Sequence, residues 1–475
     1  MLKQISEFKY QLDQENGMKV PGMIYANHKI LKDTGEEPLN QVKNVACLPG
    51  IQKYSFAMPD IHWGYGFPIG GVAAFDCENG VISPGGVGYD INCGVRMIAT
   101  NLTQEEIKDK IDDIAVALYK AVPSGVGASG EIVLKKNEVK KVLEQGAEWA
   151  LQHGMGWPED LERIEDRGRM KFYGGADDIS DRAFERGMDQ LGTLGAGNHF
   201  LEVQRVDKLF MPEIAEKFGI IRDCIVIMFH TGSRGLGYQV CDDHLHELRN
   251  STGRYNIEIK DPQLVCAPIK SGEGKRYFNA MSGAANFAWA NREIITDKIR
   301  GAFEHVFKAG SRKLGMKVIY DISHNIARME EHEVDGQNKL LCVHRKGATR
   351  SLPQGHKLLC EELKETGQPV LLPGDMGRAS FILVGDKESK ETFYSSAHGA
   401  GRLLSRHAAL KQGKGRDILD ELAKQGIIVK VKSRKLLSEE APFAYKDAED
   451  ITNIVEAAGL ARRVAKFKPV AVIKG

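Results

Sequence analysis

Short apolar runs bounded by polar residues or glycine recur along this chain of 475 residues. Runs of about four to eight residues with such boundaries are typical of strands buried within a sheet. They predict strands at residues 71–75, 95–99, 225–229, 318–322, 370–372 and 381–384. The chain should therefore contain at least one extensively buried sheet.

Longer stretches place apolar residues at helical spacing. The clearest begins at Thr103, which can form a capping box with Glu106 ahead of apolar residues that run from Ile107 to Leu118. Further helices are predicted at 137–152, 280–308, 404–410, 417–424 and 447–458. Helices and strands do not alternate strictly, which favours an α+β fold with mixed sheets over a doubly wound parallel sheet.

The sequence gives no sign of division into domains, since internal repeats, low-complexity tracts and long proline- or serine-rich linkers are missing. We therefore expect a single domain over residues 1–475. The stretch at about 125–175 is glycine-rich at both ends and charged between them, which predicts a peripheral helical insertion.

Composition mainly excludes classes of protein. Hydrophobic residues make up 42% and charged residues 27%, ordinary values for a globular protein and unlike those of a disordered chain. The net charge of +1 requires neither a nucleic-acid nor a membrane partner. No apolar run approaches the roughly 18 residues of a membrane helix, and the first residues lack the apolar stretch of a signal peptide. We expect a cytoplasmic protein.

Candidate metal chemistry gathers where predicted strands end. His230 and His324 each follow a buried strand, which offers a ligand on a rigid support. With Asp90, Cys93 and His199 they form a mixed oxygen, sulfur and nitrogen set that suits manganese, zinc or cobalt. Taken alone, each histidine is more often a hydrogen-bonded core residue, and Cys93 a buried thiol. The spacing has no local metal-site signature, so both interpretations stay open.

A second candidate is His398, which is flanked by small residues and followed by Arg402. A histidine that attacks phosphorus needs this steric access, backbone donors for the oxygens and a guanidinium for charge. A glycine-rich turn with a structural histidine is the alternative. The basic runs at 344–350 and 462–474 have the composition of phosphate-binding segments, although solvated surface faces are the commoner explanation.

Seven ordered segments stand out for their glycines, histidines and other polar residues: 60–71 (DIHWGYGFPIGG), 85–96 (GGVGYDINCGVR), 195–202 (GAGNHFLE), 230–235 (HTGSRG), 324–325 (HN), 345–347 (RKG) and 398–402 (HGAGR). Together they resemble the RtcB-type RNA-splicing ligases. The resemblance extends from about Gly50 to Gly475, nearly the whole chain.

The resemblance implies a GTP- and manganese-dependent ligase, which joins an RNA 3′-phosphate or 2′,3′-cyclic phosphate end to a 5′-hydroxyl end in tRNA splicing and RNA repair. It implies that His398 attacks the α-phosphate of GTP and carries GMP, which passes to the RNA end as RNA-3′-pp-5′-G. Family members have one α+β domain with stacked sheets flanked by helices. The expected partners are broken or spliced tRNA ends and the small activator archease, and the expected state is a monomer.

The resemblance also assigns ligands. It implies that Cys93 bridges two manganese ions, with Asp90 and His199 completing one site and His230 and His324 the other. It implies that the guanylate is held by Asn198, His199, Phe200, Leu201, Glu202, His324, Asn325, Pro373, Gly374, Asp375, Met376, Ser380, His398, Gly399, Ala400, Gly401, Tyr445 and Lys474.

Within this scheme, elementary chemistry suggests further roles. An attacking imidazole must be neutral and needs an acceptor for its other nitrogen, for which Asp60 is the candidate. Candidate cations for RNA or guanylate phosphates are Arg234, Lys346, Arg402 and Arg406, with Arg234 and Lys346 counted as catalytic. Asp375 would repel phosphates, so we expect it to hold a donor instead.

Two other functions fit the same residues. A metal-dependent phosphoesterase would use the metal ligands and would not need His398. An RNA-binding protein with structural metals would form no nucleotide adduct.

Overall fold

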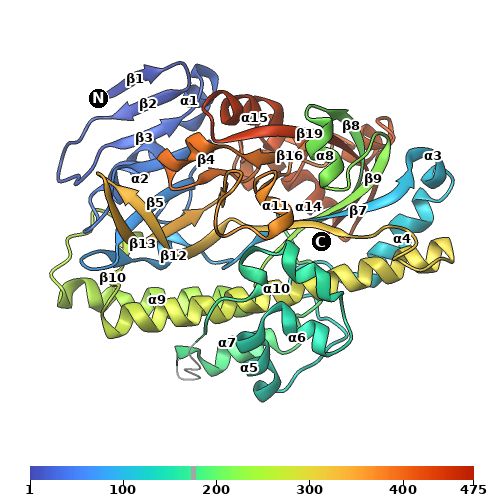
Figure 1. Ribbon diagram of the computed structural model, residues 1–475, viewed down its shortest axis with the longest axis horizontal. Helices are drawn as coiled ribbons and strands as arrows, with labels where there is room; N and C mark the ends of the chain where they lie inside the picture. Colours follow the sequence, from blue (N-terminus) through green and yellow to red (C-terminus); the bar gives the residue numbers. More distant parts are fainter. Residues whose placement is uncertain (173–177) are drawn as a thin grey trace.

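The computed structural model describes residues 1–172 and 178–475. Residues 173–177, which include the end of the predicted insertion, lie outside the described residues. Most strands belong to two large sheets, and side chains from both contribute to one hydrophobic core between them (Figure 1). Two strand pairs, β3 with β4 and β18 with β19, are parallel, whereas the others are antiparallel. The expected α+β fold with mixed sheets is confirmed.

The first sheet has seven strands, in the order β1 (Leu2–Ser6), β2 (Lys9–Leu12), β3 (Gly22–Tyr25), β4 (Ser55–His62), β5 (Ile69–Asp76), β13 (Gln337–Lys346) and β12 (Asn325–Val334). The second has eight strands, in the order β11 (Val318–Ser323), β7 (Gly94–Thr103), β9 (Cys224–Thr231), β8 (Phe200–Leu209), β19 (Ala461–Lys474), β16 (Ser380–Gly385) and β15 (Pro369–Leu372), with β18 (Ile428–Val431) beside β19. Two short pairs complete the strands, β6 (Val81–Ile82) with β10 (Ala267–Pro268) and β14 (Ala348–Arg350) with β17 (Ser395–Ala397).

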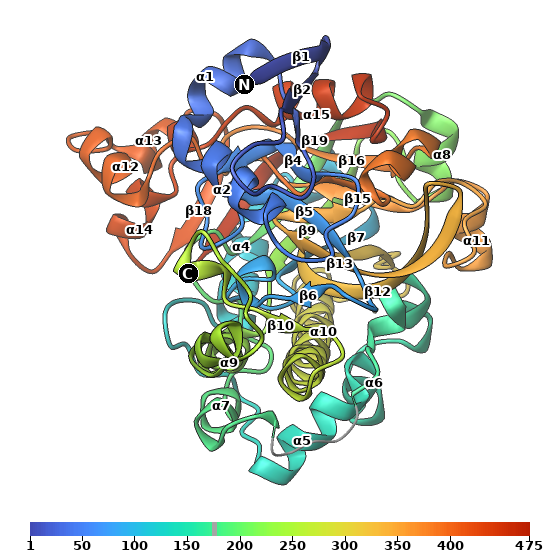
Figure 2. The same cartoon turned by 90° about the vertical axis from the view of Figure 1, so that its left-hand side faces the viewer.

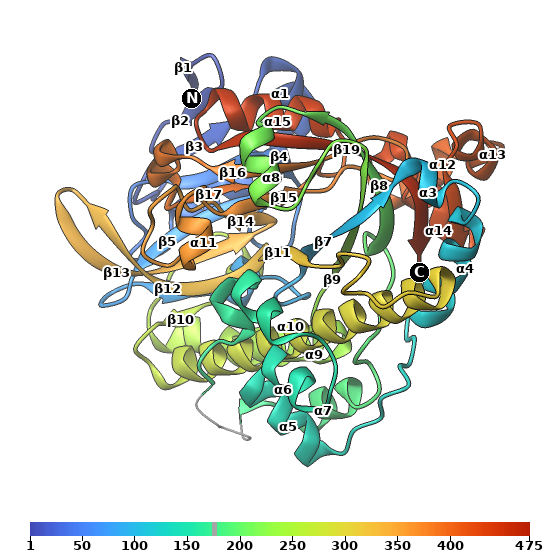
Figure 3. The same cartoon turned by 45° about the vertical axis from the view of Figure 1, so that its right-hand side comes forward.

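Two long helices lie below the sheets, α9 (Arg234–Arg254) and the 36-residue α10 (Gly272–Phe307), which Figure 2 views nearly end-on. The remaining helices are α1 (His28–Thr34), α2 (Glu36–Ala46), α3 (Gln104–Ile107), α4 (Ile111–Ala121), α5 (Lys136–Gln145), α6 (Ala147–Gln152), α7 (Asp181–Gly187), α8 (Pro212–Lys217), α11 (Glu361–Lys364), α12 (Arg406–Gln412), α13 (Ile418–Ala423), α14 (Arg434–Glu439) and α15 (Ala448–Ala457). Short 3-10 turns include η1 (Pro84–Gly86) and η3 (Glu165–Gly168). The β12–β13 hairpin and the α12–α14 cluster lie at opposite ends of the molecule (Figure 3).

All six predicted strands are confirmed, within β5, β7, β9, β11, β15 and β16. The helix boundaries differ more. The capping box of Thr103 and Glu106 forms, but α3 ends at Ile107 and a new helix begins at Ile111. The helix predicted at 137–152 divides at Gly146, whose φ of 61° interrupts it. The helix predicted to begin at 280 begins at Gly272, because the Ser271 side chain caps it.

The segment predicted as an insertion contains α5 and α6, which pack against α10. They lie on the side of α10 away from the sheets (Figure 1). None of the helices in the described ranges combines the length and apolarity that crossing a bilayer demands.

Candidate functional site

Four potential metal ligands lie at one edge of the second sheet. Strand β7 lies between β9 and β11, and its first residue, Gly94, pairs with Thr231 on one side and Ser323 on the other. This register brings Cys93, which precedes Gly94, next to His230 and His324. His199 arrives from the residue before β8, on the far side of β9.

The ligand atoms converge on the Cys93 sulfur. Its Sγ lies 3.3 Å from His199 Nε2 and 3.1 Å from His230 Nε2. His230 Nε2 and His324 Nε2 are 3.2 Å apart, and Asp90 Oδ2 is 2.8 Å from His199 Nε2. Cys93, His199 and His230 form a candidate metal triad, with all three ligand atoms within 4.8 Å of one another. Within the described part of the chain, Asp90 Oδ1 is buried without a hydrogen-bond partner, which leaves it free to bind a cation.

Burial controls the protonation of these groups. It lowers the pKa values of His230 and His324 well below the usual range, and the neighbouring imidazoles lower them further. Burial alone would raise the pKa of Asp90, but the hydrogen bond and charge of His199 and the charge of Arg234 hold it below the usual range. Burial raises the pKa of Cys93 well above that of a free thiol. The imidazoles of His230 and His324 and the Asp90 carboxylate therefore already have their ligating forms, whereas the Cys93 thiolate needs a cation nearby.

A buried arginine from α10 holds the backbone that carries the ligands. Arg292 pairs with Asp321 through two hydrogen bonds, of 2.7 and 2.9 Å. Its Nη1 also donates to the carbonyls of Asn92 at 2.7 Å and Thr231 at 3.0 Å. These residues adjoin Cys93 and His230 in the sequence. The long helix thus positions side chains separated by more than a hundred residues.

His398 lies beyond His324, with the two ring centroids 4.8 Å apart. His398 follows β17. Oδ2 of Asp60, in β4, accepts hydrogen bonds from the backbone N–H of His398 at 2.9 Å and from its Nδ1 at 2.5 Å. This arrangement leaves Nε2 available. Only a glycine at 401 lets the chain after His398 pass so close to Asp60, because its φ is 69° and a Cβ there would lie 2.3 Å from the Asp60 carbonyl oxygen.

A cavity of about 240 Å³ opens beside His398. Most of the residues expected to hold a guanylate line it: Asn198, Phe200, Glu202, His324, Asn325, Pro373, Gly374, Asp375, Met376, His398, Gly399, Ala400, Gly401, Tyr445 and Lys474. Leu201 packs into the core with its side chain, because neighbouring residues in β8 face opposite ways. Ser380 lies beneath the wall and accepts a hydrogen bond from the Gly374 N–H at 3.0 Å.

Arg234 and Lys346 occupy different surroundings. Asp90, Cys93, His199, His230 and His324 together are called the metal-ligand cluster below. Arg234 lies beside this cluster, with its Nη1 3.4 Å from His199 Nδ1. The Lys346 amino group donates to the backbone carbonyls of Tyr65 and Gly85. Burial lowers the pKa of Lys346 to about 7. Burial therefore favours the neutral form of this amino group more than water does.

Asp375 pairs with Arg378 rather than pointing an unpaired charge into the cavity. Its Oδ2 accepts from Arg378 Nε at 2.6 Å, and its Oδ1 accepts from the backbone N–H groups of Gly377 and Arg378. The carboxylate therefore stabilises the turn that carries it.

Sequence reasoning missed two polar residues of the cavity, His62 and Glu440. His62 lies in one of the seven segments, and burial lowers its pKa to about 3. Glu440 is buried and accepts from Tyr445 Oη and from Arg402 Nη1 at 3.0 Å. Nothing in the sequence around Glu440 distinguishes it from an ordinary helix-end glutamate.

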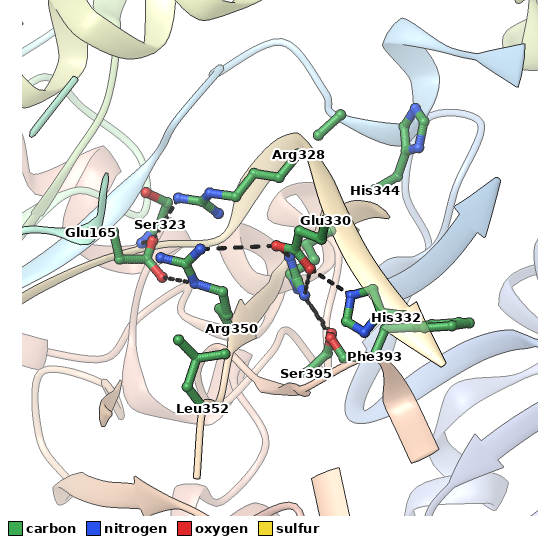
Figure 4. A network of polar contacts seen from close by, with 12 residues as sticks. Glu165, Ser323, Arg328, Glu330, His332, His344, Arg350, Leu352, Phe393 and Ser395 are labelled. Carbon is green, nitrogen blue, oxygen red and sulfur yellow. Dashed lines mark hydrogen bonds and ion pairs between the residues drawn. The ribbon is translucent and has the colours of Figure 1, made fainter. Parts of the chain in front are cut away.

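A buried ion-pair network lies beside Ser395 of β17, the strand that precedes His398 in the chain, and includes Glu165, Glu330 and Arg350 (Figure 4). Arg345 donates to both carboxylate oxygens of Glu330, at 2.7 and 2.9 Å, and to Ser395 Oγ at 2.9 Å. Arg350 lies 3.3 Å from Glu165 in the same network. Arg345 is 0% and Arg350 4% exposed, so the basic run at 344–350 is not a surface face.

The Arg345→Met variant is expected to lower the free energy of unfolding by about 3–5 kcal/mol, because it leaves Glu330 buried without its guanidinium. Urea denaturation measures this change. The matched control is Arg276→Met, which removes an exposed pair with Glu247 and should cost less than about 1 kcal/mol. Equal losses in the two variants would contradict this role for Arg345.

The site combines a buried cluster of candidate metal ligands with an adjacent cavity lined by a positioned histidine, an arrangement typical of metal-dependent enzymes. Residues 41–475 match the family model described as tRNA-splicing ligase RtcB. The chain is 51% identical to the tRNA-splicing ligase RtcB of Methanococcus maripaludis, over 99% of this chain and 98% of the relative. It is 50% identical to that of Thermococcus kodakarensis, over 100% and 99%, and 49% identical to the RNA-splicing ligase RtcB of Mycobacterium tuberculosis, over 92% and 100%. The chain belongs to the RtcB family of tRNA-splicing ligases.

Proposed function

We propose that the chain is an RNA ligase that joins a 3′-phosphate or 2′,3′-cyclic phosphate end to a 5′-hydroxyl end, with GTP and manganese, in tRNA splicing and RNA repair. It acts as a monomer, with the activator archease as a partner. The observation that carries the proposal is the position of His398, which Asp60 orients beside His324 at the cavity. Family membership supports the joining of RNA ends as the outcome.

His398 is the nucleophile of the first step. Asp60 accepts the hydrogen on Nδ1, so Nε2 keeps its lone pair. Nε2 attacks the α-phosphorus of GTP, a P–N bond forms, and the bond to the departing pyrophosphate breaks. Asp60 stabilises the charge that develops on the ring, and GMP stays attached as a phosphoramidate.

Two manganese ions would be held by Asp90 with His199 and by His230 with His324, and Cys93 would serve both. Asp90 Oδ2 is 2.8 Å from His199 Nε2, the Nε2 atoms of His230 and His324 are 3.2 Å apart, and Cys93 Sγ lies 3.3 Å from His199 Nε2 and 3.1 Å from His230 Nε2. Manganese, when bound, would neutralise the triphosphate and favour the departure of pyrophosphate. The low pKa values of His230 and His324 keep both imidazoles unprotonated for this task.

Glu202 supports the choice of GTP. A carboxylate can accept from two neighbouring N–H groups, which the Watson–Crick edge of guanine offers and that of adenine does not. Burial raises the pKa of Glu202 to about 7, while the charge of Lys474 favours its ionised form. Both residues line the cavity.

RNA ends react in the later steps. An oxygen of the RNA 3′-phosphate attacks the phosphorus held by His398, the P–N bond breaks, and RNA-3′-pp-5′-G forms. The 5′-hydroxyl of the second end then attacks the 3′-phosphorus and GMP leaves; a cyclic end must first be hydrolysed. Arg234, beside His199, is placed to bind these phosphates. Lys346 is the second candidate cation, although its present partners are backbone carbonyls.

Incubation of the protein with α-labelled GTP and manganese tests the proposal. We expect a covalent label that is labile in acid and stable in base, and that RNA with a 3′-phosphate removes. Labelled ATP should give no adduct. Release of RNA phosphate without an adduct would indicate a phosphoesterase, whereas RNA binding with neither reaction would indicate a binding protein.

The Glu202→Gln variant is expected to raise the KM for GTP in this labelling reaction by roughly 10- to 100-fold, because an uncharged amide cannot accept both hydrogen bonds. In the unmodified protein, KM should fall as pH rises through about 7, where Glu202 loses its proton. Initial rates between pH 6 and 8 measure both effects. The exposed Glu131→Gln variant is the control, and a pH-independent KM that matches it would exclude this role for Glu202.

A further inference from the structure

Three tyrosines form an aromatic stack next to the metal-ligand cluster. The rings of Tyr65 and Tyr89 meet edge to face, with centroids 5.4 Å apart. Tyr89 and Tyr238 stack at 4.7 Å, with 25° between their planes. The guanidinium of Arg186 lies 5.0 Å from the centre of the Tyr238 ring. Aromatic rings and an arginine thus follow one another in a continuous line.

The stack is continuous with the metal-ligand cluster through the backbone. Tyr89 immediately precedes Asp90, and Tyr238 lies one helical turn beyond Arg234 on α9. Arg186 comes from α7, which packs against α9 (Figure 2). Helices α7 and α9 thus hold the outer end of the tyrosine stack in place.

Exposure separates the inner from the outer end. Tyr65 and Tyr89 are partly buried, and packing accounts for them. Tyr238 is 45% exposed and Arg186 is also exposed, so packing does not account for their place at the surface. An exposed ring beside a guanidinium is the surface on which proteins stack unpaired nucleotides.

The stack also differs from the cavity beside His398, which none of its residues line among the described part of the chain. If a guanylate occupies that cavity, an RNA end must reach the same phosphorus from another direction. The stack adjoins Asp90 and Arg234, which both contact His199, whereas His398 contacts His324. It is therefore placed where an RNA strand can approach without displacing the guanylate.

We propose that Tyr238, supported by Tyr89 and Arg186, binds the base of a nucleotide near an RNA end that is to be joined. The base stacks on the exposed ring, and the guanidinium pairs with the adjoining phosphate. This inference rests on the proposed function, because it assumes that RNA reacts at the metal-ligand cluster. Stacking of this kind tolerates any base, which suits an enzyme that acts on broken ends of varied sequence.

Binding of fluorescent single-stranded RNA to the full-length protein with manganese tests the inference. Two RNAs are used, one with a 5′-hydroxyl end and one with a 3′-phosphate end. The Tyr238→Ala variant should bind at least one of them roughly tenfold more weakly, while Tyr238→Phe keeps its affinity. An abasic nucleotide near the bound end should weaken the unmodified protein similarly, without further effect in Tyr238→Ala.

The control is Tyr255→Ala, which removes an exposed tyrosine roughly 25 Å away at the other end of α9 and should leave RNA binding unchanged. Unchanged affinity of Tyr238→Ala for both RNAs would overturn the inference. It would also be overturned if the abasic nucleotide weakened binding to Tyr238→Ala as much as it weakens binding to the unmodified protein. GTP labelling is measured in parallel and should not change in Tyr238→Ala. If the unmodified protein failed to label while binding still depended on Tyr238, the proposed function would fail and the nucleotide-binding stack would stand.

Discussion

The His398→Ala variant is expected to lose covalent GMP attachment by roughly a thousandfold or more, because no other group replaces the attacking nitrogen. Gel-based measurement of labelled protein after incubation with GTP and manganese gives the rate. Joining of 3′-phosphate and 5′-hydroxyl ends should fall in parallel. Manganese content should not change, because His398 is outside the proposed ligand set.

Asp60→Asn separates the role of orientation from that of the nucleophile. A single oxygen of Asp60, Oδ2, accepts hydrogen bonds from both the backbone N–H and Nδ1 of His398. An amide NH₂ in its place could accept from neither group, and an amide oxygen there would lack the charge that stabilises the developing imidazolium. Labelling should fall by roughly a hundredfold or more while the fold is kept.

For His398→Ala, the exposed His407→Ala variant is the matched control. Full labelling in His398→Ala would refute the covalent mechanism.

The Cys93→Ala variant is expected to bind less than one manganese ion for each chain, against an expected two for the unmodified protein. A shared sulfur belongs to both sites, so its removal weakens both rather than one. Guanylylation should disappear with the metal. Elemental analysis after dialysis against manganese measures the first effect, and GTP labelling the second.

Another buried cysteine of the same sheet provides the control. Cys224 lies in β9 at 1% exposure and packs in the core, away from the ligand atoms. Cys224→Ala should lose some stability but keep its manganese and its labelling. Retention of both ions in Cys93→Ala would rule out a bridging sulfur, and loss of a single ion would assign Cys93 to one site alone.

Strands were predictable because burial on both faces produces a continuous apolar run, as at residues 225–229. The ends of such strands also indicated His230 and His324, since a polar residue directly after a buried run needs a partner. Periodicity could not show that β7 would lie between β9 and β11. That register depends on pairing between distant segments, and the convergence of the ligands on Cys93 depends on that register.

Other parts of the site left no local trace. Arg292 resembles any helical arginine in the sequence, yet it is fully buried and holds the backbone beside two ligands. In the sequence, Arg345 and Arg350 belong to a basic run typical of an exposed surface. In the structure both are buried, because Arg345 pairs with Glu330 and Arg350 with Glu165. Charge in a sequence predicts exposure only where no distant partner of opposite charge is brought close by the fold.

Strand β19 supplies Lys474 to the cavity and pairs with β8 across more than 250 residues. During translation, β8 leaves the ribosome long before the segment that must lie beside it. Until then β8 has no partner on the side where β19 will pair, and the wall of the cavity is complete only once Lys474 has emerged. A chain that ended before this segment would lack both the strand that pairs with β8 and the Lys474 side chain that lines the cavity.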